Sequence, residues 1–419
     1  MRLWIVSVGE PLPVDGANTR LRRMGNLAMF ASEEGVDVEW FSVSFDHYKK
    51  TQRCEGDADF QINDKFVMHL VDSVPYKRNV SLARIKHHKR AGEAIFRRMN
   101  ECRKPDVIIA SMEPLEVSRA AVRYAEENGI PCIVDVRDLW PEIYYDVIPK
   151  PLHWMLDFYV KSCAKVLNYT MNRCDSIVGL SRGFLEYGLK YAGRERRESD
   201  AVHPIAYPNN DYSLYKEKLG EYWGSYGINS DDFIVIFLGN FGDQFKFDEI
   251  IEAAKHFESR GNVKFVLCGN GKNEENIRKS VGSNVIMPGW IEKEQIFSLM
   301  ASASVGIAPY IDSMNYRLNT PNKFGEYLSA SLPIAVSVSG EMQKLLEEYG
   351  CGASYKSAQD LIDFIEKYYC DDELLSKHSS NARQLYEDMF NADSANQKLL
   401  NHIKKVAETK KESESIAVR

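Results

Sequence analysis

The chain has 419 residues, of which 44% are hydrophobic and 27% are charged, and its formal net charge is −7. This composition is ordinary for a folded protein, so it excludes extensive disorder and fibrous repeats, and the negative charge disfavours a general nucleic-acid-binding protein. Because a chain of this length exceeds what one hydrophobic core usually holds, we expect two domains of about 200 residues each.

The apolar runs and the cysteines indicate the cellular compartment of the protein. No apolar run approaches the roughly 18 residues that cross a bilayer, and residues 1–13 are too short an apolar stretch for a signal peptide. The eight cysteines lie far apart and form no Cys-x-x-Cys pair, which argues against a zinc site or a disulfide framework and fits a reducing compartment. We therefore expect a cytoplasmic protein.

The first half of the chain alternates short β-branched runs with helical patterns. Strands are expected at residues 3–8, 38–43, 66–71, 107–110, 132–136 and 176–180. After the first strand, residues 17–31 repeat apolar side chains at spacings of four and three, which indicates one face of a helix. Such alternation predicts parallel strands with helices on both faces of the sheet, a doubly wound α/β fold.

The pattern lapses at residues 206–211, where Tyr-Pro-Asn-Asn-Asp predicts an interdomain linker. It then restarts, with strands expected at 233–238, 263–268, 285–287, 305–308 and 334–338. The fold class is therefore α/β, with two doubly wound domains, 1–207 and 208–384, facing a central cleft. We expect a helix at about 385–408 that packs back on the first domain, followed by a frayed, charged tail at 409–419.

In open α/β sheets, ligands bind beyond the carboxyl ends of the strands, so the loops after strands are the candidate sites. Loop 9–20 places Gly16 before a helix start, where free N–H groups can bind an anion; the alternative is a surface loop capped by Asp15. Loop 238–246 opens the first helix of the second domain with Gly239 and Lys246. A lysine at the positive end of a helix opposes the macrodipole, a conflict that a bound phosphate would remove; the alternative is a solvated lysine.

A third loop, residues 319–328, repeats this pattern. Thr320 is a good N-cap and Pro321 fits the first helical position, so Lys323 also lies at a helix start. Asn322 and Glu326 are four residues apart and share a face. Free amides and Lys323 suit a diphosphate, while Glu326 can accept hydrogen bonds from a ribose diol. The alternative is a Lys323–Glu326 ion pair.

A fourth segment, Asp-Val-Arg-Asp-Leu-Trp-Pro-Glu at residues 135–142, follows a strand of the first domain. Charged groups around a Trp-Pro turn can orient a polyhydroxyl ligand through bidentate hydrogen bonds. The alternative is an Arg137–Glu142 pair beside a packed Trp140.

A basic stretch at residues 77–104 holds ten basic and two acidic residues. Its helical pattern gives an apolar face made of Leu82, Ile85, Ile95, Phe96 and Met99. Such a helix can rest on anionic lipid at the inner face of the cell membrane. The alternative is an exposed helix that packs this face on the sheet.

These motifs together resemble a known family. The loop at Gly16–Arg20, the Arg-Asp-Leu-Trp-Pro-Glu run, the Tyr-Pro-Asn-Asn-Asp linker, the Gly-Asn-x-Gly loop with Lys246, and Pro-Asn-Lys-x-x-Glu-Tyr-Leu occur in this order. The chain thereby resembles the GT-B glycosyltransferases of family 4 (glycosyltransferase group 1), which are retaining enzymes. The resemblance covers nearly the whole chain and is strongest to bacterial enzymes that build capsule, O-antigen of lipopolysaccharide, or other exopolysaccharide.

The resemblance implies a role for each matching position. Lys246 matches the phosphate-binding lysine, Glu326 the glutamate that holds the donor ribose, and residues 289–291 the loop that contacts the nucleobase. The residues with implied roles are, as catalytic, Lys246, Glu326, Arg137 and Asp138; as donor-binding, Gly16, Gly239, Asn240, Thr320, Asn322, Lys323, Gly289, Trp290 and Ile291; and as acceptor-side, Asn18, Arg20 and Trp140.

Two positions depart from the family pattern. Asn240 stands where members commonly have an arginine, which leaves Lys246 and Lys323 as the main cations, and Leu318 stands where many have a second glutamate. We read these departures as a subtype of the polysaccharide-building branch.

The implied activity is transfer of a hexose from a nucleoside diphosphate sugar to a lipid-linked or oligosaccharide acceptor, with retention. Helix N-termini and the two lysines would stabilise the departing diphosphate. No cofactor and no metal are expected, since no Asp-x-Asp motif lies at a plausible donor site. Two alternatives remain: a nucleotide-sugar 2-epimerase of the same fold, and a non-catalytic subunit that binds nucleotide sugar.

Overall fold

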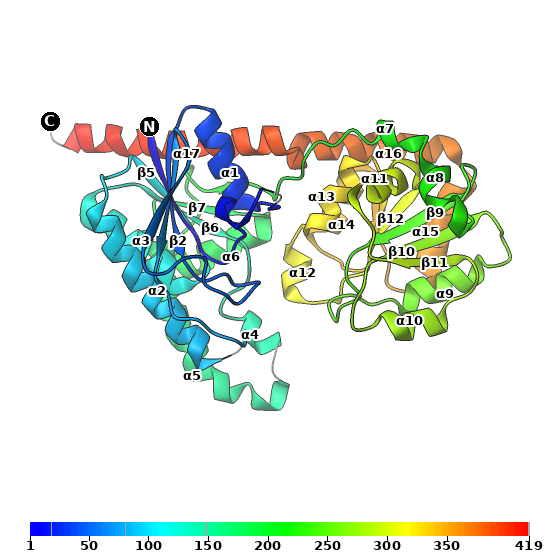
Figure 1. Ribbon diagram of the computed structural model, residues 1–419, viewed down its shortest axis with the longest axis horizontal. Helices are drawn as coiled ribbons and strands as arrows, with labels where there is room; N and C mark the ends of the chain where they lie inside the picture. The colour runs from blue at the N-terminus through cyan, green and yellow to red at the C-terminus, as the bar shows by residue number, and fades with distance from the viewer. Residues whose placement is uncertain (18, 80, 147–148, 418–419) are drawn as a thin grey trace. The chain divides into compact units, whose positions relative to one another are not determined.

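The computed structural model describes residues 1–17, 19–79, 81–146 and 149–417 (Figure 1). The chain forms two compact units: unit 1 comprises Met1–His203 and Asn396–Arg419, and unit 2 comprises Pro204–Ala395. The sequence placed the boundaries after residues 207 and 384. The structure shifts both because Tyr207 donates its N–H to Phe390 O at 2.8 Å, and the Phe390 ring packs 5.6 Å from that of Phe324 in unit 2.

Unit 1 is built on an eight-stranded sheet in the order β3-β4-β2-β1-β5-β6-β7-β8. Its strands are β1 (Arg2–Val6), β2 (Asp37–Val43), β3 (Ala58–Asn63), β4 (Phe66–Val71), β5 (Val107–Ser111), β6 (Cys132–Val136), β7 (Ser176–Gly179) and β8 (Ala201–Val202). All neighbours are parallel except β3 and β4, which are antiparallel. The strand order reverses between β1 and β5, which makes their loops the topological switch point.

The helices of unit 1 cover both faces of this sheet. They are α1 (Arg23–Glu33), α2 (Leu82–Glu101), α3 (Leu115–Asn128), α4 (Ile143–Asp146), α5 (Trp154–Arg173), α6 (Arg182–Ala192) and, from Asn396 on, α17 (Ala392–Ala417), with short 3₁₀ turns η1 (Pro13–Asp15) and η2 (Lys150–Leu152). Along β1, Leu3 and Ile5 share a core with residues of α1 and α17, whereas Trp4 faces the other way and packs 5.2 Å from Tyr124 of α3. This alternation is what a strand covered on both faces requires.

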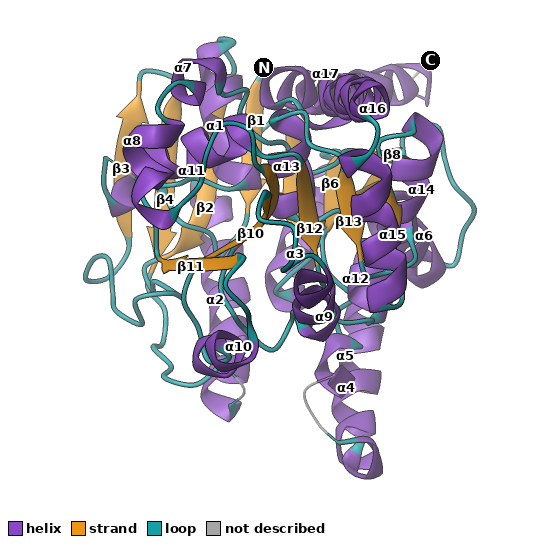
Figure 2. Ribbon diagram, turned by 90° about the vertical axis from the view of Figure 1, so that its right-hand side faces the viewer, coloured by secondary structure: helices purple, strands orange, loops and turns teal. Residues whose placement is uncertain are grey.

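Unit 2 repeats the architecture with a six-stranded parallel sheet in the order β11-β10-β9-β12-β13-β14. Figure 2 labels β10, β11, β12 and β13 of this sheet. Its strands are β9 (Phe233–Leu238), β10 (Val263–Cys268), β11 (Val285–Gly289), β12 (Val305–Ala308), β13 (Ile334–Val336) and β14 (Gly352–Ser354). Its helices are α7 (Ser213–Lys216), α8 (Leu219–Trp223), η3 (Gly224–Tyr226), α9 (Asp248–His256), α10 (Glu274–Ser280), α11 (Lys293–Ser302), α12 (Met314–Leu318), α13 (Asn322–Ser329), α14 (Glu341–Tyr349), α15 (Ala358–Tyr369), α16 (Asp372–Leu385) and η4 (Tyr386–Phe390). The predicted α/β, doubly wound class is confirmed in both units.

The C-terminal segment differs from its prediction. The sequence predicted a helix to about residue 408 and a frayed tail from 409, but α17 continues to Ala417. Four of its added residues are Lys or Glu, which have favourable helix propensities. Within the described ranges, no helix combines the length and the apolarity that a membrane span requires.

Candidate functional site

Two loops meet at the switch point of unit 2, where the strand order reverses between β9 and β12. The Lys246 N–H donates to Pro309 O at 2.8 Å, and the Ile311 N–H donates to Gln244 O at 3.0 Å. The loop after β9 is therefore held by main-chain hydrogen bonds against the segment after β12. This edge of the sheet is where ligands of open α/β domains bind.

Lys323 joins the start of α13 to the end of β9. Its ammonium donates to Leu238 O and lies 4.8 Å and 5.1 Å from the ring centroids of Phe237 and Phe245. Gly239, with φ of +154°, follows directly, and a Cβ at this position would collide with that ammonium. The glycine leaves room for the Lys323 ammonium at the strand end, which places one predicted cation at the switch point.

The start of α13 differs from its prediction by one residue. The helix begins at Asn322 with Pro321 as its N-cap, so the prediction of Thr320 as N-cap is wrong. The Thr320 side chain is buried instead of lying over the helix start, and its hydroxyl has no hydrogen-bond partner among the described residues. The first turn of α13 carries no acidic side chain, so its positive end is electrostatically open to an anion.

Lys246 lies in a different environment. It precedes α9, whose first turn contains Asp248 and Glu249, and its ammonium pairs with Glu249. That hydrogen bond raises the pKa of Lys246. Because these two carboxylates already complement the helix dipole, a phosphate is not needed to explain this lysine, whose side chain is 55% exposed.

The carboxylate of Glu326 is held in place from the linker. Its Oε1 accepts a hydrogen bond from the Tyr207 hydroxyl at 2.8 Å. Asn322 is exposed one turn earlier on the same helical face. The structure thus brings Asn322, Lys323 and Glu326 onto the first two turns of one helix.

The predicted nucleobase loop lies at the end of β11. Gly289 has φ of +84° and accepts the Gly269 N–H at 2.7 Å, so it ends the strand in a turn. Trp290 then projects into solvent with 74% of its surface exposed, whereas Ile291 is buried.

Asn240, which departs from the family pattern, lies in the loop after β9. Its Oδ1 accepts a hydrogen bond from Gln244 at 2.6 Å, so this side chain shapes the loop.

In unit 1, the ends of β1, β5 and β6 bring together a network of charges. Arg137 donates to the Glu10 carboxylate and, at 2.8 Å, to Ser111 Oγ. Arg23, in the first turn of α1, binds Asp135 through two hydrogen bonds of 2.9 Å. Burial alone would lower the pKa of Arg137, but the charges of Glu10 and Asp135 outweigh burial and raise this pKa.

Glu113 completes this network and was missed by the sequence analysis. Its Oε1 accepts the Asp138 N–H at 3.2 Å. Burial, reinforced by the Asp138 charge, raises the pKa of Glu113 to about 8. The signal was available, because Glu10 and Glu113 each follow a strand end at the switch point of unit 1, but an isolated glutamate in a loop is too common to single out.

The alternative pairing of Arg137 with Glu142 is wrong. Glu142 accepts hydrogen bonds from the hydroxyls of Tyr187 and Tyr191 on α6, while Arg137 turns toward Glu10. Trp140 stacks 5.5 Å from the Arg84 guanidinium, so the Trp-Pro turn contacts the start of α2.

The loop at residues 9–20 is anchored rather than loose. Asp15 pairs with Arg53 at 2.5 Å, and its second oxygen accepts the Leu12 N–H at 2.8 Å. Gly16 is exposed with φ of +138°, and Arg20 is exposed further on. The predicted acceptor-side residue Asn18 lies outside the described residues.

The apolar face predicted for lipid contact on α2 is packed inside unit 1. Ile95 and Met99 are fully buried, and α2 packs along α3. Only Leu82, at the first position of the helix, is largely exposed, at 84%. The alternative, a helix that packs its apolar face inside the domain, therefore holds for Ile95 and Met99, whereas Ile85 and Phe96 are half-buried. Contact of α2 with lipid stays a prediction.

One side-chain group among the described residues has metal-ligand character. Potential ligand atoms of Glu39, His69 and Cys102 all lie within 4.8 Å of one another. They come from β2, β4 and the C-terminal end of α2, not from the strand-end loops. His69 is hydrogen-bonded to Glu39 at 3.1 Å and to Asp59 at 2.8 Å, so these groups satisfy each other.

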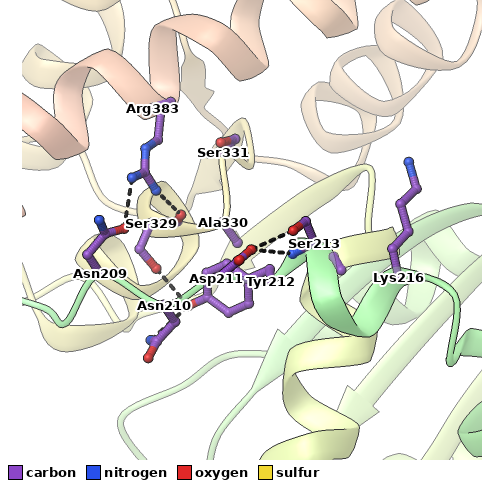
Figure 3. A pocket seen from close by; sticks show the side chains of 11 residues that line it. Asn209, Asn210, Asp211, Tyr212, Ser213, Lys216, Ser329, Ala330, Ser331 and Arg383 are labelled. Atoms are coloured by element: carbon purple, nitrogen blue, oxygen red, sulfur yellow. Dashed lines mark hydrogen bonds between the residues drawn. The ribbon is translucent and has the colours of Figure 1, made fainter.

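A pocket of about 590 Å³ lies elsewhere in unit 2 (Figure 3). Its lining comes from the linker, the C-terminal end of α13 and α16, and includes Asn209, Tyr212, Ser329 and Arg383. Arg383 crosses it to donate to Ser329 O and Asn209 Oδ1, both at 2.8 Å. The pocket therefore lies at the opposite end of α13 from Lys323 and contains none of the predicted site residues.

Comparisons with known proteins bear on both units. Residues 221–385 match the family model described as glycosyl transferases group 1. The alpha-monoglucosyldiacylglycerol synthase of Acholeplasma laidlawii is 22% identical over 229 residues, which cover 54% of this chain and 54% of that protein. The chain thus spans about half the length of this curated relative.

Solved structures align over nearly the whole chain. Sucrose-phosphate synthase from Thermosynechococcus elongatus has a TM-score of 0.70 at 13% identity, covering 97% of this chain and 99% of that one. WaaG, a glycosyltransferase involved in lipopolysaccharide biosynthesis, has a TM-score of 0.64 at 17% identity, covering 96% and 99%. Anabaena HepE in complex with UDP has a TM-score of 0.63 at 14% identity, covering 96% and 99%. These likenesses show the GT-B fold and, with the family model, support a glycosyltransferase.

Proposed function

From the glycosyltransferase group 1 match in unit 2, we propose that this chain transfers a sugar from a nucleoside diphosphate sugar to a lipid-linked or oligosaccharide acceptor. The observation that carries the proposal is the meeting of β9 and α13. There, the Lys323 ammonium lies against Gly239 beside a helix N-terminus that has no acidic residue in its first turn. Retention of configuration and a place in surface-polysaccharide biosynthesis complete the proposal, as in the family that the chain resembles.

The donor would bind at the carboxyl edge of the sheet in unit 2. Its diphosphate would lie at the first turn of α13, where main-chain N–H groups and Lys323 supply positive charge. Glu326, oriented by Tyr207, would accept hydrogen bonds from the ribose hydroxyls. The exposed Trp290 ring offers an apolar face to a nucleobase, and the HepE complexes with UDP and UDP-glucose favour uracil as that base.

The chemistry would be departure of the diphosphate from the sugar. Negative charge that develops on the leaving oxygen would be stabilised by the α13 N-terminus and Lys323, with Lys246 as a second cation. Attack from the same face lets the departing phosphate take the acceptor proton, so no protein nucleophile is required and no metal is proposed. Arg137 and Asp138 in unit 1 would contact the transferred sugar and the acceptor.

The test is nucleotide binding and turnover in Glu326→Gln and Lys246→Ala. A glutamine keeps the hydrogen bond from Tyr207 but removes the charge that ribose hydroxyls would contact, so we expect kcat/KM to fall roughly 10- to 100-fold, corresponding to about 1.4–2.7 kcal/mol. Isothermal titration with UDP and a coupled assay for UDP release provide the measurements. Glu275→Gln, an exposed carboxylate on α10, is the control.

Turnover equal to wild type in both Glu326→Gln and Lys246→Ala would remove this site assignment. Incubating the donor alone separates transfer from isomerisation, since an epimerised sugar formed without acceptor would favour the epimerase alternative. Binding of UDP without turnover on any acceptor would favour the non-catalytic alternative.

A further inference from the structure

The first turns of α5 expose large apolar side chains. Trp154 is 71% exposed, Met155 60% and Phe158 87%, and Leu152 in the preceding turn η2 is 44% exposed. Their spacing of three and four residues places them on one side of the helix. The tryptophans Trp4 and Trp40 of the same unit are, by contrast, fully buried. A cluster of this kind on a surface marks an interaction site.

The rest of α5 is an ordinary packed helix. Its opposite side is buried through Val160, Cys163 and Leu167, and the helix packs between α3 and α6. The exposed apolar cluster is therefore not the core-facing side of a misplaced helix. Figures 1 and 2 both show the first turns of α5 projecting from the rest of unit 1.

Lysines surround the apolar cluster. Lys150 precedes it in η2, and Lys161 and Lys165 continue the exposed side of α5 over the next two turns. The acidic Asp157 lies between them but is half-buried and accepts a hydrogen bond from the Tyr145 hydroxyl at 2.8 Å. The exposed surface is thus apolar at its tip and cationic behind it.

We propose that this surface docks on an anionic lipid bilayer. We call it the α5 tip and define it by Leu152, Trp154, Met155 and Phe158 with Lys150, Lys161 and Lys165. The aromatic and aliphatic side chains would enter the boundary between headgroups and acyl chains, and the lysines would contact anionic headgroups with their stems along the apolar layer. Four apolar residues suffice for peripheral contact and are far too few to span a membrane.

A series of side-chain contacts links α5 to the segment that follows β6 in unit 1. The chain leaves β6 at Val136, passes through Arg137, Asp138 and α4, and then enters α5. The start of α2 lies there as well, since Arg84 stacks on Trp140, Trp140 packs 4.9 Å from Tyr144, and the Tyr144 and Tyr159 hydroxyls are 3.4 Å apart. The role that we give to this membrane contact rests on the proposed function. A bilayer bound at the α5 tip would bring a lipid-linked acceptor to unit 1.

Co-sedimentation with vesicles tests the inference. We expect the full-length chain to bind vesicles that contain 30% phosphatidylglycerol in phosphatidylcholine, and to bind vesicles of phosphatidylcholine alone at least about tenfold more weakly. Trp154→Ala/Phe158→Ala should lower the partition coefficient at least tenfold. Lys161→Glu and Lys165→Glu should each lower it about fivefold or more, and less so at high salt. Leu214→Ala, 70% exposed on α7 in unit 2, is the matched control and should bind as wild type.

A second readout places the contact at this surface. Brominated acyl chains should quench tryptophan fluorescence in wild type and much less in Trp154→Phe, which keeps the apolar ring and should still bind. Wild type that stays in the supernatant, or a Trp154→Ala/Phe158→Ala variant that binds as wild type, would overturn the inference. So would a wild-type dimer by light scattering that Phe158→Glu converts to a monomer, since the surface would then hold a second copy.

The two proposals fail separately. UDP affinity of Trp154→Ala/Phe158→Ala should equal that of wild type, because these residues lie in unit 1 and the proposed nucleotide site lies in unit 2. Vesicle binding without any nucleotide binding would support membrane docking through the α5 tip and contradict the proposed function.

Discussion

Glu113 lies where three strand ends of unit 1 meet, beside Asp138 and Arg137, and its ionisation couples this network to pH. Burial and the Asp138 charge raise the pKa of Glu113 to about 8 from its ordinary value of 4.5. A folded-state pKa above the unfolded value means that folding favours the protonated form. The resulting contribution to stability is therefore full below about pH 4.5 and is lost as pH rises through about 8.

Glu113→Gln should remove this pH dependence. Relative to wild type, the free energy of unfolding of the variant should improve steadily between pH 5 and pH 8, by at most about 1.4 kcal/mol for each pH unit. Urea unfolding at pH 5, 6.5 and 8 measures it. Glu33→Gln, an exposed carboxyl on α1, should give a constant difference from wild type, and a constant difference for Glu113→Gln would contradict the prediction.

The contact between Gly239 and Lys323 could be predicted from the sequence only in part. Gly239 was placed in the loop that opens the first helix of the second domain, and Lys323 was predicted as a cation at a helix start. That the two residues touch depends on which strands and helices become neighbours in space. The spacing of residues along the chain does not contain that information.

Gly239→Ala should destabilise unit 2, because the backbone has φ of +154°, which an L side chain rarely adopts, and because the Lys323 ammonium would have to move away from the new Cβ. We expect a loss of about 1–3 kcal/mol in the free energy of unfolding. Adding Lys323→Met should recover part of that loss, which a double-mutant cycle in urea unfolding would detect. Gly261→Ala, where a Cβ would meet nothing within 4 Å, is the control, and equal losses in the two glycine variants would contradict this reading.

At the scale of elements, strands with continuous β-branched runs were predicted well and irregular ones were missed. β9 and β10 match their predicted ranges, because buried parallel strands are apolar on both faces. β3 was missed although it alternates polar and apolar residues as an antiparallel edge strand does, and β8 and β14 are two and three residues long, too short to show a period. The start of α13 was displaced by one residue, a shift that local capping signals do not resolve.

The exposed apolar surface on α5 was missed, for a physical reason. On α2 the basic residues drew attention to an apolar face that is partly buried within unit 1, whereas on α5 the exposed residues Trp154 and Phe158 follow the same spacing as a core face. Sequence periodicity gives the presence of an apolar face but not what covers it. Only the packing of α5 against α3 and α6 shows that the outer side is unoccupied within the described part of unit 1.

For the whole molecule, α17 ties the last part of the chain to the first. Leu399, Leu400, Ile403 and Val406 lie in one core with residues of β1 and α1. Ile403→Ala should therefore destabilise unit 1 by about 2–5 kcal/mol, as expected for removing a large side chain from a buried site. Hydrogen exchange should show faster exchange in unit 1 while unit 2 keeps its protection.

Asn401→Ala, an exposed position on the same helix, is the control for Ile403→Ala. Because two units are present, a single unfolding midpoint would mix their transitions, so exchange resolved by segment is the appropriate measurement. Loss of protection confined to unit 2 would show that α17 does not support the core of unit 1.

The position of α17 also sets an order on biosynthesis. A ribosome delivers residues 1–203 first, yet the core that they form lacks one wall until residues 399–407 emerge. Unit 2, by contrast, is contiguous and has all its strands once residue 354 is out. The half of the protein made first is therefore completed last, and until then its unfinished apolar surface is what a chaperone at the exit tunnel would meet.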